Sequence, residues 1–504
     1  MLATLLSAAL AGIDGRIVRV EVDVSPGLPS FTVVGLPDTS VRESRDRVRT
    51  AIRNSDFEFP WQHITINLAP PDVRKEGAAY DLPIALGILA ATGALPSRAY
   101  TDVVVVGSLS LDGEVRPTGG VLPVAMAAAR AGIGAAIVPA ENAAEAAIVE
   151  GLDVWPVASL DEAAGALTDR NGAHRYAGHD ADAVAGDDPS CGDFADIRGQ
   201  LTARRALEVA AAGGHHVLLT GPPGSGKTML ARSLAGILPP LSAAEALEVT
   251  SIHSVAGLLP RGAGLIRTRP FRAPHHTISD VALVGGGTHP RPGELSLAHA
   301  GILFLDEMPE FERRALEVLR QPLEEGRVRI ARAAASVEFP ASVTLVGAMN
   351  PCPCGYFGHP ARACRCAPPQ RERYAARISG PLLDRIDIRV DVPWLPPDVL
   401  GDERPQESSA RIRERVTGAR ERQAARGAGV GAALNSRLAG RMLRRVARPD
   451  EAGRALLHSA VERLALSGRA HDRILRVARS IADLAGRENV IADDVAEALQ
   501  YRLG

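Results

Sequence analysis

The stretch Gly221-Pro-Pro-Gly-Ser-Gly-Lys-Thr228 decides the fold of the segment around it. It fits G-x-x-x-x-G-K-[ST] at every fixed position, a pattern typical of a phosphate-binding loop. The apolar run Val217-Leu218-Leu219 before it predicts a buried strand, and Met229-Leu230-Ala231 after it opens a predicted helix. A chance glycine-rich turn is the alternative. The order strand, loop, helix favours nucleotide binding instead, because a helix N-terminus attracts phosphate.

The residue types inside the loop predict its chemistry. Glycines let backbone N–H groups turn inward around a phosphate. Lys227 can reach the β- and γ-phosphates of ATP, and the Thr228 hydroxyl can hold Mg²⁺. The nucleotide-binding residues that we predict here are Gly221, Pro222, Pro223, Gly224, Ser225, Gly226, Lys227 and Thr228.

A second motif adds two carboxylates. The apolar run Ile302-Leu303-Phe304-Leu305 predicts a buried strand that ends in Asp306 and Glu307. Such a pair alone is usually a solvated strand end. Downstream of a phosphate-binding loop, Asp306 suits the Mg²⁺ shell, and Glu307 suits polarisation of the attacking water. The two motifs together predict ATP hydrolysis.

Length and composition set further limits. A chain of 504 residues with 46% hydrophobic content is long enough for about three domains and is not a disordered protein. Its net charge of −2 indicates no overall basic field, so nucleic-acid binding would need local patches. No apolar run approaches the ~20 residues of a membrane span. Five cysteines, four of them clustered, are typical of a reducing cytoplasm with a metal site.

The pattern along the chain divides it into four segments and predicts an α/β fold. Residues 1–168 mix strands and helices; Val18, Val20, Val22 and Val24 alternate with polar residues, as in a half-buried strand. Residues 169–192 are polar and aperiodic, which predicts a linker. The ATPase core is expected over 193–400. A charged helical segment follows over 401–504.

Several longer motifs occur in a specific order around the phosphate loop. They are Asp196-Ile-Arg-Gly-Gln200, Phe271-Arg-Ala-Pro-His-His276, Pro292-Gly-Glu-Leu-Ser-Leu-Ala-His299, Asn350-Pro-Cys-Pro-Cys-Gly355 and Ser379-Gly-Pro-Leu-Leu-Asp-Arg-Ile-Asp387. Over nearly the whole chain they resemble the magnesium-chelatase-like AAA+ ATPases of the ComM/YifB type. The resemblance implies a P-loop core, a Lon-protease-like N-terminal α+β domain (ribosomal S5 domain 2-like) and a C-terminal helical lid. It also implies a hexameric DNA helicase that drives branch migration.

The resemblance assigns three further residues to catalysis. Asn350, at the end of a predicted strand, takes the sensor-1 role near the γ-phosphate, with a simple turn before Pro351 as the alternative. Arg385 resembles an arginine finger supplied to a neighbouring subunit. Arg469 resembles the sensor-2 arginine, with Arg473 as the competing choice.

Two inserted segments are typical of the family that this chain resembles. Residues 270–297 resemble a helix-2 insert with Gly285-Gly286-Gly287 at its tip, and His275 and His276 within it are expected to be turn-packing histidines rather than metal ligands. Residues 326–340 predict a hairpin. Its positive charges at Arg327, Arg329 and Arg332 could contact a DNA backbone, although a solvated charged hairpin is the plainer interpretation.

The cysteine cluster predicts a metal site. Cys352-x-Cys354 and Cys364-x-Cys366 could close tetrahedrally around Zn²⁺. An iron–sulfur cluster and a metal-free cluster stay open, whereas a disulfide is not expected in the cytoplasm. Cys191, in the linker, is expected to be a bystander.

The N-terminal domain resembles Lon-type proteases in two segments, over residues 75–83 and 113–120. Alignment with that family places Ala79 at the position of the catalytic serine and Leu122 at that of the lysine. Neither side chain can attack a carbonyl or move a proton, so we expect a scaffold without peptidase activity.

Three functions follow, in order of preference. The first is an ATP-driven DNA translocase or branch-migration helicase, acting as a homo-oligomer, with ATP, Mg²⁺ and Zn²⁺ as the expected cofactors. The second is a chelatase-type motor subunit that remodels a partner protein, which the Lon-like domain and the cysteine cluster disfavour. The third is an ATP-dependent protease, which the missing dyad opposes.

Overall fold

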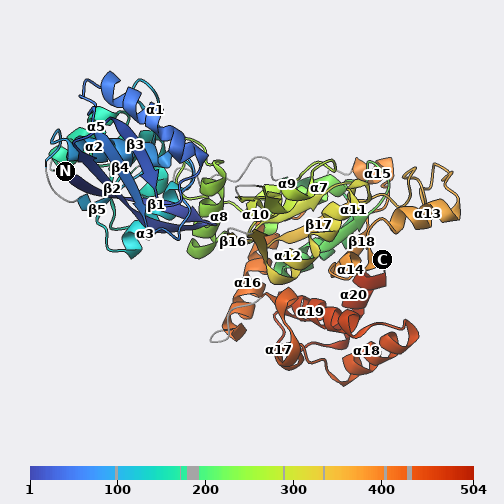
Figure 1. Cartoon of the computed structure of the whole chain (residues 1–504). Coiled ribbons are helices and arrows are strands. Elements are labelled where there is room, and N and C mark those ends of the chain that lie inside the picture. The colour runs from blue at the N-terminus through green and yellow to red at the C-terminus, as the bar shows by residue number, and fades with distance from the viewer. Residues whose placement is uncertain are drawn as a thin grey trace.

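The computed structural model describes residues 1–96, 100–170, 172–178, 192–287, 290–332, 335–401, 404, 406–427 and 434–503. The chain forms an N-terminal sheet domain, a central domain around a parallel sheet, and a helical C-terminal part (Figure 1). Most of the predicted linker over 169–192 lies outside the described residues, and so does Cys191.

The N-terminal domain is built on a seven-stranded mixed sheet of order β3-β4-β2-β1-β5-β8-β9. Val18, Val20, Val22 and Val24 are buried on one face of β2, so the predicted strand is confirmed. The strands are β1 (Leu2–Ala11), β2 (Asp14–Ser25), β3 (Ser30–Val34), β4 (His63–Ala69), β5 (Tyr100–Val105), β8 (Ala135–Pro139) and β9 (Asp153–Val157). The helices are α1 (Thr39–Asn54), α2 (Asp81–Ala91), α3 (Val121–Arg130), α4 (Ala143–Ala146) and α5 (Leu160–Thr168).

The central domain contains a five-stranded sheet of order β11-β14-β17-β10-β18, in which every pairing is parallel. Since parallel strands all end at one edge, residues that follow different strands meet there. The strands are β10 (Val217–Thr220), β11 (Phe271–Arg272), β14 (Ile302–Leu305), β17 (Thr344–Met349) and β18 (Ile388–Asp391). The helices α6 (Leu201–Gly213) and α7 (Lys227–Ile237) pack together in the core beside them.

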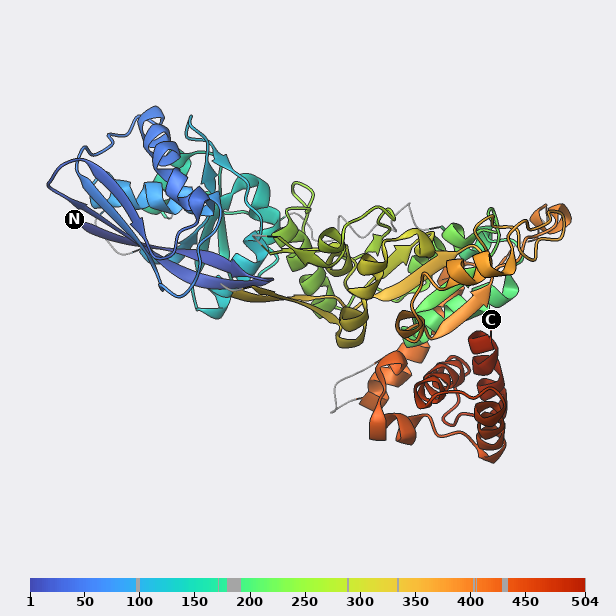
Figure 2. The ribbon, with the colours of Figure 1, turned by 45° about the vertical axis from the view of Figure 1, so that its right-hand side comes forward.

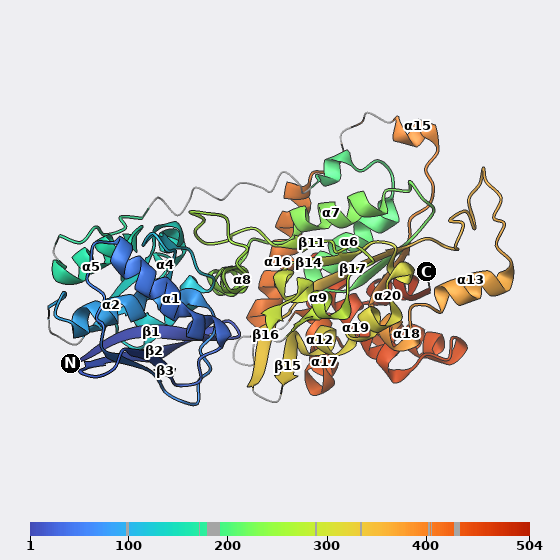
Figure 3. The same ribbon diagram turned by 45° about the horizontal axis from the view of Figure 1, so that its top comes forward.

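Two inserted segments extend the central domain. The first follows α8 (Ala243–Ala256) and contains α9 (Asp280–Val284), β12 (Gly285–Gly286) and β13 (Arg291–Pro292). The second is a hairpin of β15 (Arg327–Arg332) and β16 (Ala335–Pro340), which confirms the hairpin predicted over 326–340. In Figures 2 and 3 this hairpin reaches toward the N-terminal domain.

The N-terminal domain contacts both of these regions. Gly120 N–H donates to Ser254 O of α8 at 3.0 Å, and a Cβ on Gly119 would lie 3.2 Å from the same oxygen. Glu145 is 4% exposed and accepts hydrogen bonds from the Ser254 hydroxyl (2.6 Å), the Asn142 amide (2.6 Å) and Leu122 N–H (3.2 Å). At the hairpin, a Cβ on Gly12 would lie 2.7 Å from Glu338 O. The domain therefore bridges α8 and β16.

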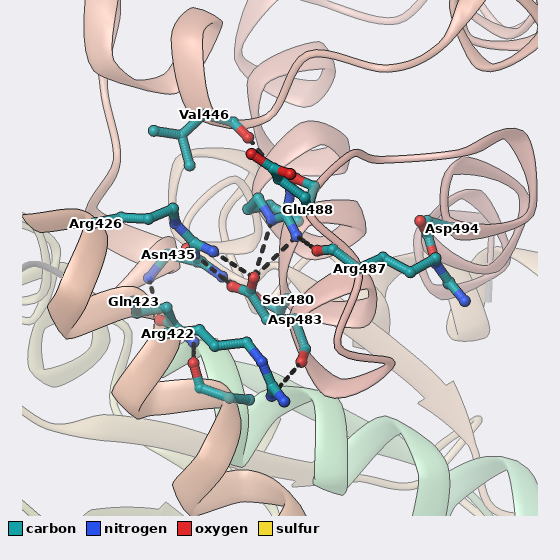
Figure 4. A network of polar contacts seen from close by, with 12 residues as sticks. Arg422, Gln423, Arg426, Asn435, Val446, Ser480, Asp483, Arg487, Glu488 and Asp494 are labelled. Carbon is teal, nitrogen blue, oxygen red and sulfur yellow. Dashed lines mark hydrogen bonds and ion pairs between the residues drawn. The ribbon is translucent and has the colours of Figure 1, made fainter.

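The C-terminal helices are joined by a buried polar network (Figure 4). Asp483 accepts from Arg426 at 2.5 and 2.6 Å and from Asn435 at 2.8 Å, so α19 is tied to the end of α16. His215, just before β10, joins Asp387 (3.1 Å) to Ser480 of α19 (2.8 Å) and so fastens these helices to the sheet. The helices are α16 (Ser409–Gly427), α17 (Gly440–Val446), α18 (Glu451–Arg463), α19 (Gly468–Leu484) and α20 (Ala492–Leu503). Within the described part of the chain, no helix has the length and apolar character to cross a membrane.

Candidate nucleotide and metal sites

The phosphate loop turns between β10 and α7 in the conformation that its glycines allow. Gly224 and Gly226 have φ of 77° and 90°, the left-handed region that other residues rarely adopt. A Cβ on either would meet nothing within 4 Å, so the loop borders open space there. The Ser225 hydroxyl is buried and has no hydrogen-bond partner among the described residues. A glycine cradle with an unpaired buried hydroxyl fits a bound phosphate.

Lys227 and Thr228 point to the same edge of the sheet. The Lys227 ammonium donates to the carbonyls of Gly221 (2.7 Å) and Pro222 (2.9 Å) and to Asn350 Oδ1 (3.3 Å). Burial lowers its pKa, and the carboxylates of Asp306 and Glu307 oppose that shift. These contacts hold a cation where a phosphate chain would lie along the loop.

The carboxylates lie beside this cation. Thr228 Oγ1 donates to Asp306 Oδ2 at 2.9 Å, so two hard oxygen donors suited to Mg²⁺ are already in contact. Glu307 adopts φ of 50°, an unusual conformation for a residue with a side chain. His276 Nδ1 lies 3.6 Å from Glu307 Oε2. His276 packs against the rings of His275 and Phe311, as expected of a turn-packing histidine, and it also lies beside the Glu307 carboxylate.

Residues that follow Asn350 cover the phosphate loop. A Cβ on Gly355 would lie 2.7 Å from two ring carbons of Pro223, so backbone of the cysteine segment rests against the loop. Asn350 therefore joins two structures: its amide oxygen contacts Lys227, and its chain continues directly into the cysteine cluster.

The four cysteines come together. Cys352 Sγ lies 3.4 Å from Cys354 Sγ and 3.7 Å from Cys364 Sγ, and all four sulfurs lie within 4.8 Å of one another. Four sulfurs bound tetrahedrally at ~2.3 Å from Zn²⁺ would be about 3.8 Å apart, close to these separations, whereas a disulfide bond measures ~2.05 Å. Backbone N–H groups of Tyr356 and Arg365 lower the pKa of Cys354 to about 6. The cluster can hold a metal ion.

Arg385 and Arg469 do not join the phosphate loop. Both line a cavity of about 500 Å³ that is also bordered by residues preceding β10, β14, β17 and β18, at the sheet edge opposite the loop. Arg385 donates to Arg320 O at 2.8 Å and pairs with Glu324 at 2.5 Å. Arg469 is exposed, whereas Arg473 is 7% exposed and lies 3.7 Å from Asp387. The two arginines singled out from the sequence thus share one site.

The hairpin arginines are partly neutralised. Glu338 pairs with Arg327 (2.6 Å) and with Arg329 (2.9 Å), and Arg329 also lies 3.6 Å from Glu325. The side chain of Arg332 lies outside what the structure describes. Two of the three arginines predicted to contact phosphate therefore have carboxylate partners already.

Sequence reasoning missed three supports of the site. Gln200 donates to Ser225 O (3.2 Å) and Pro393 O (2.7 Å), which clamps the loop to the chain after β18. Gly355 and His276 make the contacts given above. All three belong to motifs that the sequence marked, but only tertiary proximity shows what each residue contacts.

Comparisons with known proteins cover nearly the whole chain. The family described as "Magnesium chelatase, subunit ChlI" matches residues 193–400, "Subunit ChlI of Mg-chelatase" matches 20–142, and its C-terminal family matches 406–502. A protein of Mycobacterium tuberculosis is 47% identical over 98% of this chain and 97% of its own length. YifB of Salmonella typhimurium and the competence protein ComM of Haemophilus influenzae are each 43% identical over 99% of this chain and 97% of their own.

Two relatives match over shorter stretches. Lon protease 1 of Hydrogenovibrio crunogenus is 29% identical over 162 residues, 30% of this chain and 20% of its own. The 38 kDa magnesium-chelatase subunit of Rhodobacter capsulatus is 30% identical over 176 residues, 31% of this chain and 50% of its own.

Proposed function

Because the chain belongs to the magnesium-chelatase-like proteins of the ComM/YifB type, we propose that this ATPase motor is a ring helicase that drives DNA branch migration. We place its work in recombination or natural transformation, in the cytoplasm. The observation that carries the proposal is the separation of the ATP site into two halves. Lys227, Asp306 and Asn350 meet at one sheet edge, while Arg385 and Arg469 share a cavity at the other.

The first half binds and hydrolyses ATP. When ATP binds, the Lys227 ammonium leaves the loop carbonyls and contacts the β- and γ-phosphates instead. The N–H groups of the loop surround these phosphates. Thr228 and Asp306 would hold Mg²⁺, which neutralises phosphate charge when bound. Glu307 takes the proton of the attacking water as its general base, and Asn350 hydrogen-bonds the γ-phosphate or that water.

The second half serves a neighbouring subunit. A guanidinium stabilises charge on a transferring phosphoryl group only within hydrogen-bond reach, and Arg385 and Arg469 lie at the edge of the sheet away from their own loop. In a ring, one subunit presents its loop to the next subunit's arginines. Arg385 would leave Glu324 to do so. We infer a closed homo-oligomer, a hexamer by family resemblance.

Mixing two inactive variants tests this arrangement. Arg385→Ala should bind ATP but hydrolyse it poorly, and Lys227→Ala should not bind it. Mixed rings should recover part of the activity, because intact loops then face intact arginines. Arg454→Ala, an exposed arginine of α18, is the control and should leave the rate unchanged. Full activity of Arg385→Ala alone, or no recovery on mixing, would contradict the ring site.

DNA is the proposed substrate of the motor, and the β15–β16 hairpin is its proposed contact. Arg327, Arg329 and Arg332 supply positive charge in a chain of net charge −2. The name of the ComM relative supports this proposal. A chelatase-type motor that remodels a protein is the second candidate, favoured by the match to the 38 kDa chelatase subunit. ATPase rates with single-stranded, duplex and branched DNA separate the two, because only a DNA motor is stimulated.

We further propose that the cysteine cluster holds Zn²⁺ and that the N-terminal domain is a Lon-like scaffold without peptidase activity. The sulfur separations support the metal assignment. The Lon match supports the domain assignment. Leu122, at the position assigned to the lysine, is fully buried, and its N–H donates to Glu145 in the contact with α8. At this position the domain contacts the core, and the leucine side chain itself cannot transfer a proton.

A further inference from the structure

The segment that carries the four cysteines is strongly basic. Residues 351–377 contain five arginines and a single carboxylate, Glu372, in a chain whose net charge is −2. One of these arginines, Arg377, pairs with Glu310 at 2.5 Å. Within the described part of the chain, no carboxylate forms an ion pair with the other four, which are Arg362, Arg365, Arg371 and Arg373. The surface therefore carries unneutralised positive charge, unlike the hairpin, where Glu338 pairs with two arginines.

Aromatic rings lie among these arginines. Phe357 is 49% exposed, and the Arg371 guanidinium carbon lies 4.0 Å from the centre of its ring. The Arg362 guanidinium carbon lies 5.1 Å from the centre of the Tyr356 ring, and this side chain also donates to the Tyr356 hydroxyl at 2.8 Å. A ring face attracts a cation, which favours these positions of the guanidinium groups. Exposed rings interleaved with cations are typical of surfaces on which the bases of a single strand stack.

The rings and cations are held in place by the rest of the segment. Phe357 N–H donates to the sulfur of the buried Cys352 at 3.3 Å. The His359 ring lies 5.4 Å from the Trp394 ring, centroid to centroid, and accepts from Arg362 N–H at 3.1 Å. Helix α13 (Pro368–Ala375) begins two residues after the last cysteine and carries Arg371 and Arg373. A surface ordered in this way loses little conformational freedom when a ligand binds.

This surface is separate from the hairpin that we propose as a DNA contact. In Figures 1 and 3, α13 lies at the far end of the central domain, whereas β15 and β16 lie on the side of the N-terminal domain. The segment also borders the candidate nucleotide site, because a Cβ on Gly355 would lie 2.7 Å from the Pro223 ring. Any ligand held here is thus bound beside the phosphate loop and away from the hairpin.

We propose that residues 356–373 form a second nucleic-acid site, and that this site takes a single strand. An unpaired base stacks on the exposed ring of Phe357, while Arg362, Arg365 and Arg373 neutralise phosphates of the same strand. A duplex does not fit this surface as well, because its bases are already stacked on one another and paired. The inference rests on the proposed function, since DNA is the proposed substrate of the motor.

A fluorescent ring at the proposed stacking position tests the site directly. Phe357→Trp in the full chain should lose indole emission on addition of oligo(dT), but not on addition of a duplex of the same length. The wild type, which has three tryptophans elsewhere, provides the background signal. Phe357→Ala should weaken oligo(dT) binding roughly five- to a hundredfold, the loss that corresponds to one stacked base, and Phe357→Trp should retain it.

A charge variant tests the phosphate contacts. Glutamine at Arg362, Arg365 and Arg373 together should reduce the slope of log affinity for oligo(dT) against log salt by about 0.7 for each phosphate released. The matched control removes the same charge from α17, where glutamine replaces the exposed arginines Arg441, Arg444 and Arg445. That control should leave the slope and the affinity unchanged.

The outcomes are distinct. Indole emission that oligo(dT) does not change, or a salt slope that falls equally in both triple variants, overturns the proposed site. Loss of the homo-oligomer in Phe357→Ala, measured by light scattering, also overturns it, because the surface would then face a neighbouring subunit. If no DNA binds to the wild type or stimulates its ATPase, the proposed DNA motor fails as well. If DNA stimulates the wild type and both Phe357→Ala and the charge variant bind oligo(dT) normally, only this site fails.

Discussion

At the scale of single residues, the side chain that we propose for ATP binding and the one that we propose for water activation have different surroundings. Lys227 is buried between loop carbonyls and Asn350, where its charge is poised for phosphate. Glu307 lies further out and contacts His276 rather than the loop. The two side chains can therefore be removed with different consequences.

Lys227→Ala should reduce ATP affinity at least about 100-fold, since the loss of a charge-assisted contact to phosphate costs roughly 3 kcal/mol or more. Glu307→Gln should bind ATP normally but lower kcat by about 10²–10⁴-fold, because an amide is no general base. Binding of a fluorescent ATP analogue and steady-state ATPase rates distinguish the two. Wild-type turnover by Glu307→Gln would refute our assignment of the water-activating group.

At the scale of elements, the cysteine segment and the hairpin extend in different directions from the sheet. The cysteine segment rests on Pro223 and follows Asn350, so it packs against the candidate nucleotide site. The hairpin instead reaches the N-terminal domain at Gly12 (Figure 2). The cysteine segment is therefore placed to stabilise the phosphate loop, and the hairpin is placed to contact another domain.

Protein purified without added metal should contain one Zn²⁺ per chain. Cys354→Ala should lose the metal and lower the unfolding temperature by several degrees, because an incomplete ligand set no longer stabilises the fold. Metal analysis and thermal melts make the measurement, with Cys191→Ala as a control that keeps the metal. Four freely titrating thiols together with no bound metal would exclude the site.

DNA binding should depend on the charge of the hairpin. Alanine at Arg327, Arg329 and Arg332 should reduce the slope of log affinity against log salt by about 0.7–0.9 for each phosphate that the hairpin no longer neutralises. Glu338→Gln should act in the opposite direction, because it frees the two arginines that it now pairs. Binding isotherms at several salt concentrations make the comparison. An unchanged slope in both variants would show that DNA is bound elsewhere.

At the scale of the whole molecule, the N-terminal domain is attached to the core through a buried carboxylate. Burial raises the pKa of Glu145 above that of an ordinary glutamate, against the hydrogen bonds from Ser254 and Asn142. Folding therefore raises the proton affinity of this carboxyl group. Its stabilising contribution is fully present below the ordinary glutamate pKa and is lost as pH rises through the raised one.

Glu145→Gln should remove this pH dependence and leave the domain attached at neutral pH, since the amide oxygen can still accept from the Ser254 hydroxyl and Leu122 N–H, whereas the hydrogen bond from the Asn142 amide is lost because an NH2 group only donates. Glu145→Ala should cost about 1–3 kcal/mol, because it leaves buried donors unpaired. Thermal unfolding across pH and hydrogen exchange in α8 report the effect. Glu141→Gln, in a partly exposed pair with Arg261, is the control. Equal melting of all variants at every pH would contradict a role for Glu145 in this contact.

The parts of the nucleotide site whose chemistry is local could be predicted from the amino-acid sequence. A loop such as residues 221–228 needs its glycines and its lysine at set spacings, and Asp306 and Glu307 must follow an apolar strand. The alternation of buried and polar residues in β2 could also be predicted, and so could the hairpin. Backbone geometry imposes both patterns within one short segment. The four cysteines could be grouped because they form two Cys-x-Cys pairs within one short segment.

Contacts between distant segments could be learned only from the folded chain. The parallel order of β11 and β14 brings His276 to Glu307, although the sequence favoured simple turn packing for that histidine. The path of the C-terminal helices places Arg469 in the cavity of Arg385, away from its own phosphate loop. Such contacts join segments far apart in the chain, and no local periodicity or spacing encodes which of them meet.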